Sequence, residues 1–487
     1  MNEFTNITEI IKDCISNDIF IAFTMVTAIY FSIRMIFPQF RLFPQAIKAL
    51  SDSSDDDKGI SPFQAFMTAL GSRVGVGNVA GVATAIATGG PGAIAWIWVF
   101  GLFGSAVAIV EAMLGQVFKI KDGDEYLGGP AFYISRGLKN KKIAIPVAYA
   151  FAICSIIGLG ILMPGVQSNT VVNSITQGFN TDKNVTVVVT SIIIAIVIWG
   201  GIKRISKFES IFTPIKCIGY LAFAIVVIIY YSEYIGIVFQ AILSSAVGFH
   251  PLFGGIVGSA VNMGVRRGLF STDVGYGPGG TFGAAARCDH PVKQGLLQGV
   301  SVLLSTLVIC TATALVILLS GCCEIIDPST GSVVYPGNEF SGGIVAGAGW
   351  VQAGLNTCPV LHGWAPQILA AMIAIFATGA IVGYYYVIET NVRFVMHGAS
   401  KRAMNVVKCI FIFTLIFSTI VDSSATWNLV DVGLGILGWI NFISLFILSP
   451  IAIKIMKDYS HDLRHGIKPK FDPKRYGIED ETGAWGA

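Results

Sequence analysis

The sequence predicts an all-α polytopic membrane protein with about eleven transmembrane helices. One N-terminal extra helix precedes a 5+5 inverted-repeat core that contains two broken helices. Three observations support this class: a low content of charge, repeated membrane-length apolar stretches, and two glycine-rich interruptions inside such stretches. Of the 487 residues, 54% are hydrophobic and 13% are charged, whereas soluble domains carry about 25% charged residues. The formal net charge of +3 gives no sign of nucleic-acid binding.

Apolar stretches near the roughly 20 residues that cross a bilayer recur along the chain. They lie at about 18–37, 63–88, 92–117, 144–176, 185–201, 209–232, 252–285, 295–320, 365–388, 404–422 and 427–455. Because their number is odd, the two termini are expected on opposite sides. Lys and Arg gather after the first, third, fifth, seventh, ninth and eleventh stretches, and such residues favour the cytoplasmic side. The N-terminus is therefore predicted outside, and the C-terminus inside, a prokaryotic inner membrane.

The expected organisation follows from this topology. It comprises an extracellular N-terminus, extra helix and cytoplasmic linker (1–58), a transporter core (59–455) and a cytoplasmic C-terminal tail (456–487). Residues 233–251 are expected to form an amphipathic surface helix, and residues 321–362 the largest external loop. That loop contains Cys322, Cys323 and Cys358, for which a disulfide and free thiols are both compatible with the sequence.

Residues 71–81, GSRVGVGNVAG, interrupt the second apolar stretch. Glycine weakens a helix by roughly 1 kcal/mol relative to alanine, and an arginine at bilayer depth costs roughly 2.5–3.5 kcal/mol. Irregular backbone at that depth persists only where it is buried in protein or lines a polar cavity. Close packing of small residues would explain Gly81 and Ala83, but it needs neither Arg73 nor Asn78. The segment is predicted to be a helix broken at a binding site.

A second interruption, GVRRGLFSTDVGYGPGG at 264–280, follows an apolar run from about Pro251 to Val265 that is too short to cross a bilayer. Arg266 and Arg267 are expected to cap this half-helix or to bind carbonyls exposed by the break, and a contact with a substrate carboxylate is the alternative. Once the first stretch is set aside, the two interrupted segments are the first and sixth of ten, the pattern of inverted-repeat secondary transporters. Half-helix N-termini attract a carboxylate and half-helix C-termini attract a cation, so a zwitterionic amino acid travelling with a cation matches both.

Charged side chains within the apolar stretches leave alternatives open. Arg73 either braces the core by pairing with Asp273 or Glu111, or acts near a cation site. Lys216 either extends its ammonium to the inner surface or takes part in proton coupling.

Several blocks of the sequence resemble the signature of the alanine or glycine:cation symporter family. They are Met67–Leu70, Val74–Ala83, Gly89–Ala93, Trp96–Trp98, Gly128–Ala131, Gly165–Gln167, Arg267–Gly275 and Asp289–Pro291. The resemblance covers most of residues 60–300 and, more weakly, the rest. It implies a leucine-transporter-like fold and Na⁺-coupled import of small neutral amino acids, with no enzymatic activity and no organic cofactor.

The resemblance also implies which residues meet the substrate. These are Val74, Gly75, Gly77 and Asn78 in the first break, Gln167 in the fourth span, Phe270, Ser271 and Thr272 in the second break, and the ninth span from Thr378 to Tyr384. Gly379 and Ala380 stand where a Ser-Thr pair is expected, near the cation site of this fold. Arg73, Thr378 or Lys216 would then hold the cation or supply its charge.

A proton-coupled or cation-independent amino-acid exchanger on the same scaffold is the alternative function. A channel would need a polar stripe along several helices, and an enzyme would need clustered His or acidic residues; neither pattern is visible. The expected partners are a small neutral amino acid, Na⁺ or H⁺, and membrane lipid. The exact amino acid, its stereochemistry, the stoichiometry and the oligomeric state stay open.

Overall fold

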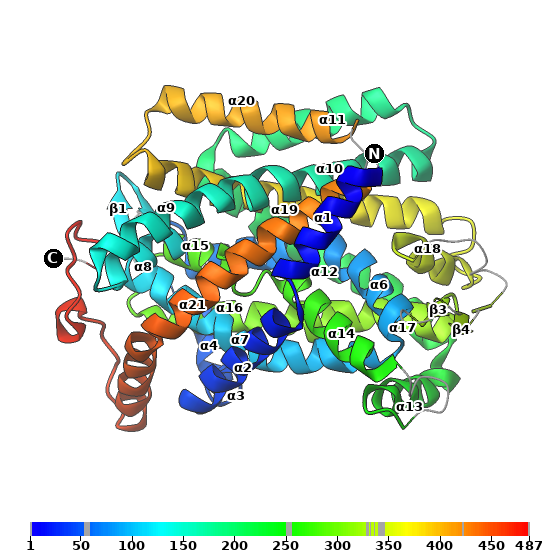
Figure 1. The fold of residues 1–487 in the computed structure, drawn as a ribbon, viewed down its shortest axis with the longest axis horizontal. Helices are drawn as coiled ribbons and strands as arrows, with labels where there is room; N and C mark the ends of the chain where they lie inside the picture. Colours follow the sequence, from blue (N-terminus) through cyan, green and yellow to red (C-terminus); the bar gives the residue numbers. More distant parts are fainter. Residues whose placement is uncertain are drawn as a thin grey trace.

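The computed structural model describes residues 2–52, 59–249, 256–327, 331, 333–335, 337–338, 346–420 and 423–485. Within these ranges the chain is almost entirely helical (Figure 1). The strands there form two short antiparallel pairs: β1 (Ile120–Asp122) with β2 (Glu125–Leu127), and β3 (Ile325–Ile326) with β4 (Val333–Tyr335). The predicted all-α class is confirmed.

The helices pack around α7, which contacts α14, α15 and α16 along its length. In chain order they are α1 (Asn2–Ile15), α2 (Asp18–Arg34), α3 (Pro38–Arg41), α4 (Phe43–Leu50), α5 (Pro62–Arg73), α6 (Ala80–Gly89), α7 (Gly92–Val117), α8 (Pro130–Gly137), α9 (Lys141–Ile157), α10 (Met163–Phe179), α11 (Lys183–Ile198), α12 (Gly201–Tyr230), α13 (Ile235–Ala246), α14 (Val257–Thr272), α15 (Pro278–Ala285), α16 (Pro291–Leu303), α17 (Thr311–Ser320), α18 (Ala348–Asn356), α19 (Ala365–Val395), α20 (Lys401–Ser418) and α21 (Ser423–Arg464). Two π-helical segments, Gly158–Leu162 and Leu304–Cys310, join α9 to α10 and α16 to α17.

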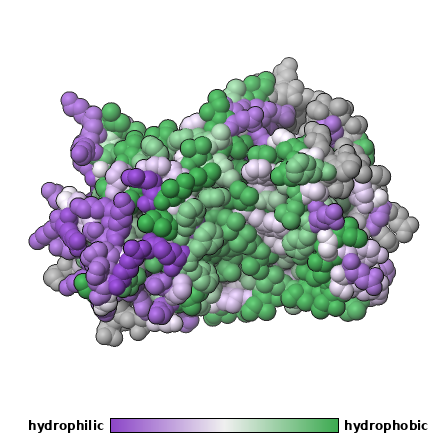
Figure 2. Space-filling view, turned by 90° about the horizontal axis from the view of Figure 1, so that it is seen from below, coloured by the Kyte–Doolittle hydropathy of each residue, from purple (hydrophilic) through white to green (hydrophobic). Residues whose placement is uncertain are grey.

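Among the described residues, 7 helices are long and apolar enough to cross a membrane. They are Thr8–Arg34, Gly92–Val117, Lys141–Phe179, Gly201–Tyr230, Pro291–Ser320, Ala365–Val395 and Trp427–Arg464. Figure 2 shows an apolar belt between two more polar ends. Side chains such as Ile196, Ile218 and Phe413 are exposed, which suits contact with lipid tails rather than water. The chain is a multi-pass membrane protein, and the total of eleven spans stays a prediction.

The two ends of the molecule carry different elements (Figure 1). One end, here called the tail end, holds β1, α8 and the C-terminal segment; the other, the loop end, holds β3, β4, α13 and α18. Helix α13 lies within the predicted surface helix and buries only one side, through Val238, Ile242 and Ala246. The thiols of Cys322, Cys323 and Cys358 are free and buried.

The first predicted break is confirmed. Ser61 and Gln64 form a capping box that starts α5, with Pro62 at its first position. The helix ends at Arg73, a 3₁₀ turn covers Val76–Asn78, and α6 begins at Ala80. The glycines in this stretch lower helical stability, and the Asn78 side chain supplies an acceptor to the interrupted backbone.

The second break is shorter than predicted and begins later. Residues 264–272, which were expected to be irregular, form the last turns of α14. The helix ends where Asp273 adopts a left-handed conformation with φ of 51°, and Gly275 and Gly277 follow at φ of 77° and 112°. The expectation was wrong because polar side chains do not break a helix when they find partners. Residues 251–255, where the half-helix was expected to begin, lie outside the described residues.

The C-terminal segment folds back over the end of the molecule that holds β1 and α8. The Lys119 ammonium lies 4.2 Å from the centre of the Trp485 ring and 4.3 Å from that of Tyr126. Arg136 and Glu481 form an ion pair at 3.0 Å. The tail thus covers the linker between α7 and α8.

This docking is expected to depend on pH. Burial lowers the pKa of Lys119 from 10.5 to about 8, although Cys288 and Asp480 oppose the shift. A state in which Lys119 is exposed to water binds more protons between about pH 8 and 10.5 than the folded state does, so the burial of Lys119 beneath Trp485 strengthens as pH rises through that window. Hydrogen exchange of residues 473–485, corrected for intrinsic rates, should slow accordingly. The same pH profile in Lys119→Met as in the wild type would contradict this.

Candidate functional site

The two breaks and two further helices meet in the interior. A methyl group placed on Gly77 would lie 3.0 Å from the Phe270 ring at the end of α14. One placed on Gly75 would lie 3.5 Å from Ala380 on α19 and 3.7 Å from the Gln167 amide nitrogen on α10. All these residues are buried. The structure therefore brings together residues from every segment that the resemblance named.

Asn78 holds the first break and links it to the second. Its Oδ1 accepts a hydrogen bond from the Gly75 N–H at 3.1 Å, and its Nδ2 donates to the Ser305 hydroxyl at 2.7 Å. The Ser305 hydroxyl lies 3.2 Å from the Ser271 carbonyl, to which it donates. Ser305 belongs to the π-helical segment before α17, and π-helical turns frequently occur at functional sites.

Gln167 lies in this region and has an unused hydrogen-bond acceptor among the described residues. Its side chain is 2% exposed, and its Oε1 has no hydrogen-bond partner among the described residues. An unsatisfied buried acceptor costs about 1–3 kcal/mol, so an occupant that donates a hydrogen bond is favoured there. Val74, also implied in the site, is fully buried at the end of α5.

The Tyr384 side chain is hydrogen-bonded to the second break. Its hydroxyl donates to the Asp273 carboxylate, at 2.9 Å from Oδ2 and 3.1 Å from Oδ1. Thr272 donates its hydroxyl to the Gly268 carbonyl, one turn back in α14. Tyr384 therefore fixes Asp273 at the position where α14 ends.

Arg73 braces the core through uncharged partners. Its Nε donates to the Thr272 carbonyl at 2.7 Å, and its Nη1 donates to the Gln298 Oε1 at 2.8 Å and to the Ser301 hydroxyl. Within the described ranges, no carboxylate lies in ion-pair contact with it. Asp273 and Glu111, the expected partners, make no direct ion pair with Arg73, although the charges of both carboxylates interact with it at longer range. Carbonyl and amide oxygens at the ends of α14 and α16 supply the acceptors instead.

Glu111 ties the second break to α21. Its carboxylate accepts from the Asn441 amide at 3.1 Å and from the Gly275 N–H at 3.3 Å. Asn441 also donates to the Gly275 carbonyl at 2.9 Å. The carboxylate thus stabilises irregular backbone at bilayer depth.

Two of the expected cation-site residues already have hydrogen-bond partners. Thr378 bonds to its own helix, and Lys216 is buried. The Thr378 hydroxyl donates to the Ala374 carbonyl at 2.7 Å. The Lys216 side chain is 0% exposed, and its Nζ donates to the Gly71 carbonyl at 2.7 Å. The expectation that Lys216 extends to the inner surface was wrong, because an acceptor and the Glu209 carboxylate meet it inside the protein.

Arg266 and Arg267 do not cap α14. Arg266 donates to the Ser16 carbonyl at 2.6 Å, between α1 and α2. The Arg267 guanidinium carbon lies 6.0 Å from the centre of the Phe270 ring. Both arginines line a narrow hollow together with Asp431. The extra N-terminal helix supplies the partner that sequence reasoning could not assign.

Sequence reasoning missed the polar stripe that faces Arg73 and Asn78. Gln294, Gln298, Ser301 and Ser305 follow one another at intervals of about one helical turn, and all four are fully buried. Side chains at that spacing share one helix face. The signal was therefore present in the sequence, as polar residues at helical spacing inside an apolar stretch.

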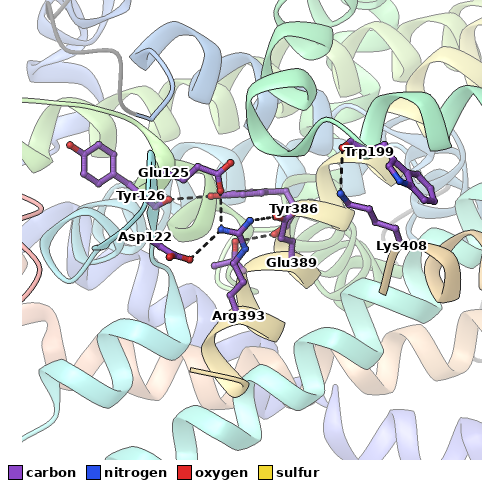
Figure 3. Close-up of polar contacts among 9 residues, drawn as sticks. Asp122, Glu125, Tyr126, Trp199, Tyr386, Glu389, Arg393 and Lys408 are labelled. Atoms are coloured by element: carbon purple, nitrogen blue, oxygen red, sulfur yellow. Dashed lines mark hydrogen bonds and ion pairs between the residues drawn. The ribbon is translucent and has the colours of Figure 1, made fainter. Parts of the chain in front are cut away.

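A second network of polar contacts fixes α19, the helix that carries Tyr384, where this helix reaches the tail end of the molecule (Figure 3). The Arg393 guanidinium lies 2.6 Å from Glu389, 3.0 Å from Glu125 and 3.3 Å from Asp122. The Tyr386 hydroxyl donates to the carbonyl of Tyr126 at 3.3 Å. These contacts join α19 to the β1–β2 hairpin.

The chain is similar to a known family and to several proteins of known name. A family model described as the sodium:alanine symporter family matches residues 1–473. The sodium/proton-dependent alanine carrier protein of Bacillus sp. (strain PS3) is 35% identical, over 89% of this chain and 96% of that protein. The sodium/alanine symporter AgcS of Methanococcus maripaludis is 30% identical, over 94% of this chain and 98% of that protein. A solved Na⁺-coupled sialic acid symporter is 14% identical, with a TM-score of 0.48, over 98% of this chain and 96% of that chain.

Proposed function

The chain belongs to the sodium:alanine symporter family, and from this premise we propose that it imports alanine, glycine or a similar small neutral amino acid together with Na⁺. The protein is a transporter and not an enzyme. One cation moving through about 100 mV supplies roughly 2.3 kcal/mol, which corresponds to about fifty-fold accumulation of the amino acid. A cation gradient is therefore an adequate source of energy.

One observation carries the proposal: the buried Gln167 side chain lies beside Gly75 in the first break, and its Oε1 has no hydrogen-bond partner among the described residues. An α-ammonium group donates hydrogen bonds and suits this acceptor. The free N–H groups of a half-helix N-terminus suit the α-carboxylate. The close contact of Gly77 with Phe270 leaves little room for a large side chain, which favours small substrates.

The proposed pocket comprises Val74, Gly75, Gly77, Asn78, Gln167, Phe270, Ser271 and Thr272, with Tyr384 acting through Asp273. Asn78 and Arg73 position its backbone. The cycle is alternating access, with the tail end in the cytoplasm of a prokaryotic cell and the N-terminus outside, because Lys and Arg concentrate in the linkers assigned to that side.

Proton coupling on the same scaffold is the second candidate. The relative from Bacillus sp. is named a sodium/proton-dependent carrier, and the buried Lys216 and Glu209 are ionisable groups beside the first break. Uptake that persists without Na⁺ and follows the pH gradient would favour this candidate.

The test is uptake of radioactive alanine and glycine into proteoliposomes. Wild-type protein should accumulate either amino acid when an inward Na⁺ gradient is imposed, and should exchange it in counterflow. Equal uptake with K⁺ or choline in place of Na⁺ would rule out Na⁺ coupling. No counterflow with any small neutral amino acid would overturn the substrate class.

Gln167→Ala is expected to weaken substrate affinity strongly. A hydrogen bond to a charged group contributes about 1.5–3 kcal/mol, or roughly 10–150-fold in affinity. The KM for alanine uptake should therefore rise by that factor while membrane insertion is retained. Asn173→Ala provides the matched control, because Asn173 is exposed on the same helix. A KM within twofold of wild type would remove Gln167 from the pocket.

A further inference from the structure

A buried ion pair lies beside the first break, against the last turn of α5. Glu209 and Lys216 are two turns apart on α12, and both side chains are 0% exposed. The Lys216 Nζ and the Glu209 Oε2 are 3.9 Å apart. Ionisable groups within a membrane domain are costly and pair with one another or with backbone carbonyls. Both kinds of partner are present here.

Two glycines on neighbouring helices make room for the pair. A methyl group on Gly71 in α5 would lie 2.0 Å from the Glu209 Oε2. One on Gly379 in α19 would lie 2.5 Å from the Lys216 Nζ. The pair therefore occupies the junction of α5, α12 and α19, where a side chain in place of either glycine would displace it.

The primary acceptor of the ammonium is a helix-terminal carbonyl. Lys216 donates to the Gly71 carbonyl at 2.7 Å, in the last turn of α5. The last four carbonyls of a helix lack intrahelical partners, and this terminus carries roughly half a negative charge. Such a position attracts cations, and the ammonium of Lys216 fills it.

Glu209 is held in place through only one of its two carboxylate oxygens among the described residues. The Thr213 hydroxyl donates to its Oε2 at 2.6 Å. Its Oε1 has no hydrogen-bond partner among the residues described. With Lys216 removed, the free carboxylate oxygen and the Gly71 carbonyl would be hard oxygen ligands at one junction, the type that binds alkali and alkaline-earth cations.

We propose that Lys216 is a tethered cation: its ammonium occupies the site at the C-terminus of α5, with Glu209 as counter-ion, in place of a freely exchanging coupling ion. Any Na⁺ that this chain transports then binds elsewhere. The inference rests on the proposed function, because it concerns how that function is coupled. It gives Glu209 a role in coupling. It also explains why Gly379 and Ala380 can lack the hydroxyl groups that were expected near a cation site.

Binding of radioactive sodium to purified protein in detergent tests the inference without any amino acid. Lys216→Ala keeps Glu209 and Gly71 and should gain a sodium site that the wild type lacks. In proteoliposomes, its alanine uptake should become a steeper function of Na⁺ concentration, with half-activation at least about tenfold higher, the effect of losing one charged hydrogen bond. Lys207→Ala, at an exposed position on the same helix, should match the wild type.

The double variant Glu209→Gln, Lys216→Met removes both charges and should fold without gaining a sodium site. Unchanged sodium binding and activation in Lys216→Ala would overturn the proposal. So would a Lys216→Ala protein that fails to fold at every Na⁺ concentration while the double variant folds, since sodium would then be unable to replace the ammonium. Failure of the proposed function would appear separately, as wild-type protein without Na⁺-driven alanine uptake.

Discussion

Asn78→Ala is expected to abolish saturable amino-acid uptake while the protein still inserts in the membrane. The substitution leaves the Gly75 N–H without its acceptor in a buried site, and it removes the donor to the Ser305 hydroxyl, which still donates to the Ser271 carbonyl. Unsatisfied buried groups cost about 1–3 kcal/mol each, so the ordered break should be depopulated by roughly a hundredfold. Because the first break forms one wall of the proposed pocket, transport should fall by about the same factor.

The measurement is initial-rate uptake of alanine into proteoliposomes that contain equal amounts of protein. Asn78→Asp keeps the acceptor for Gly75 but loses the donor to Ser305, so it should retain intermediate activity. Thr84→Ala is the control, because the Thr84 hydroxyl donates to the Ala80 carbonyl of its own helix and makes no hydrogen bond to another element among the described residues. Wild-type kinetics in Asn78→Ala would show that the break is held by other contacts.

Arg73→Met is expected to abolish transport and to lower stability. The guanidinium joins the end of α5 to the Thr272 carbonyl and to the side chains of Gln298 and Ser301. Removing it leaves those acceptors unsatisfied and leaves the buried Glu111 without a nearby positive charge. A hydrogen bond to a charged group contributes about 1.5–3 kcal/mol, and several are lost here, so thermal unfolding in detergent should move to clearly lower temperature.

Arg402→Met serves as the control, since Arg402 is exposed at the start of α20. Its unfolding temperature and uptake should equal those of the wild type. An Arg73→Met protein with wild-type stability would show that the carbonyl and amide acceptors find other donors, and that Arg73 does not brace the two breaks.

Local sequence signals predicted the first break and much less of the second. At 71–81, glycine lowers helix stability and arginine is costly inside an apolar stretch, so both residue types argue against a continuous helix. At 264–272 the same residue types remain helical, because Arg266 finds the Ser16 carbonyl on a distant segment. Local composition shows where a helix is weak, but tertiary partners decide where it ends.

The position of Lys216 shows a second limit of sequence reasoning. Its spacing from Glu209 on one helix face was visible in the sequence. The cavity that accepts both side chains was not, because Gly71 and Gly379 lie on other helices far along the chain. A lysine near the end of a span is therefore ambiguous until the neighbouring helices are placed.

The contacts around the two breaks divide into two groups with different mechanical roles. Arg73, and Asn78 through Ser305, lock the broken helices to each other and to α16, so these elements must tilt as one body. Two of the hydrogen bonds described above connect these elements to α12 and α19. Tyr384 on α19 donates to Asp273, and Lys216 on α12 donates to the Gly71 carbonyl. If the proposed alternating access separates these halves by rocking, these two hydrogen bonds are contacts that would break and re-form in each turnover.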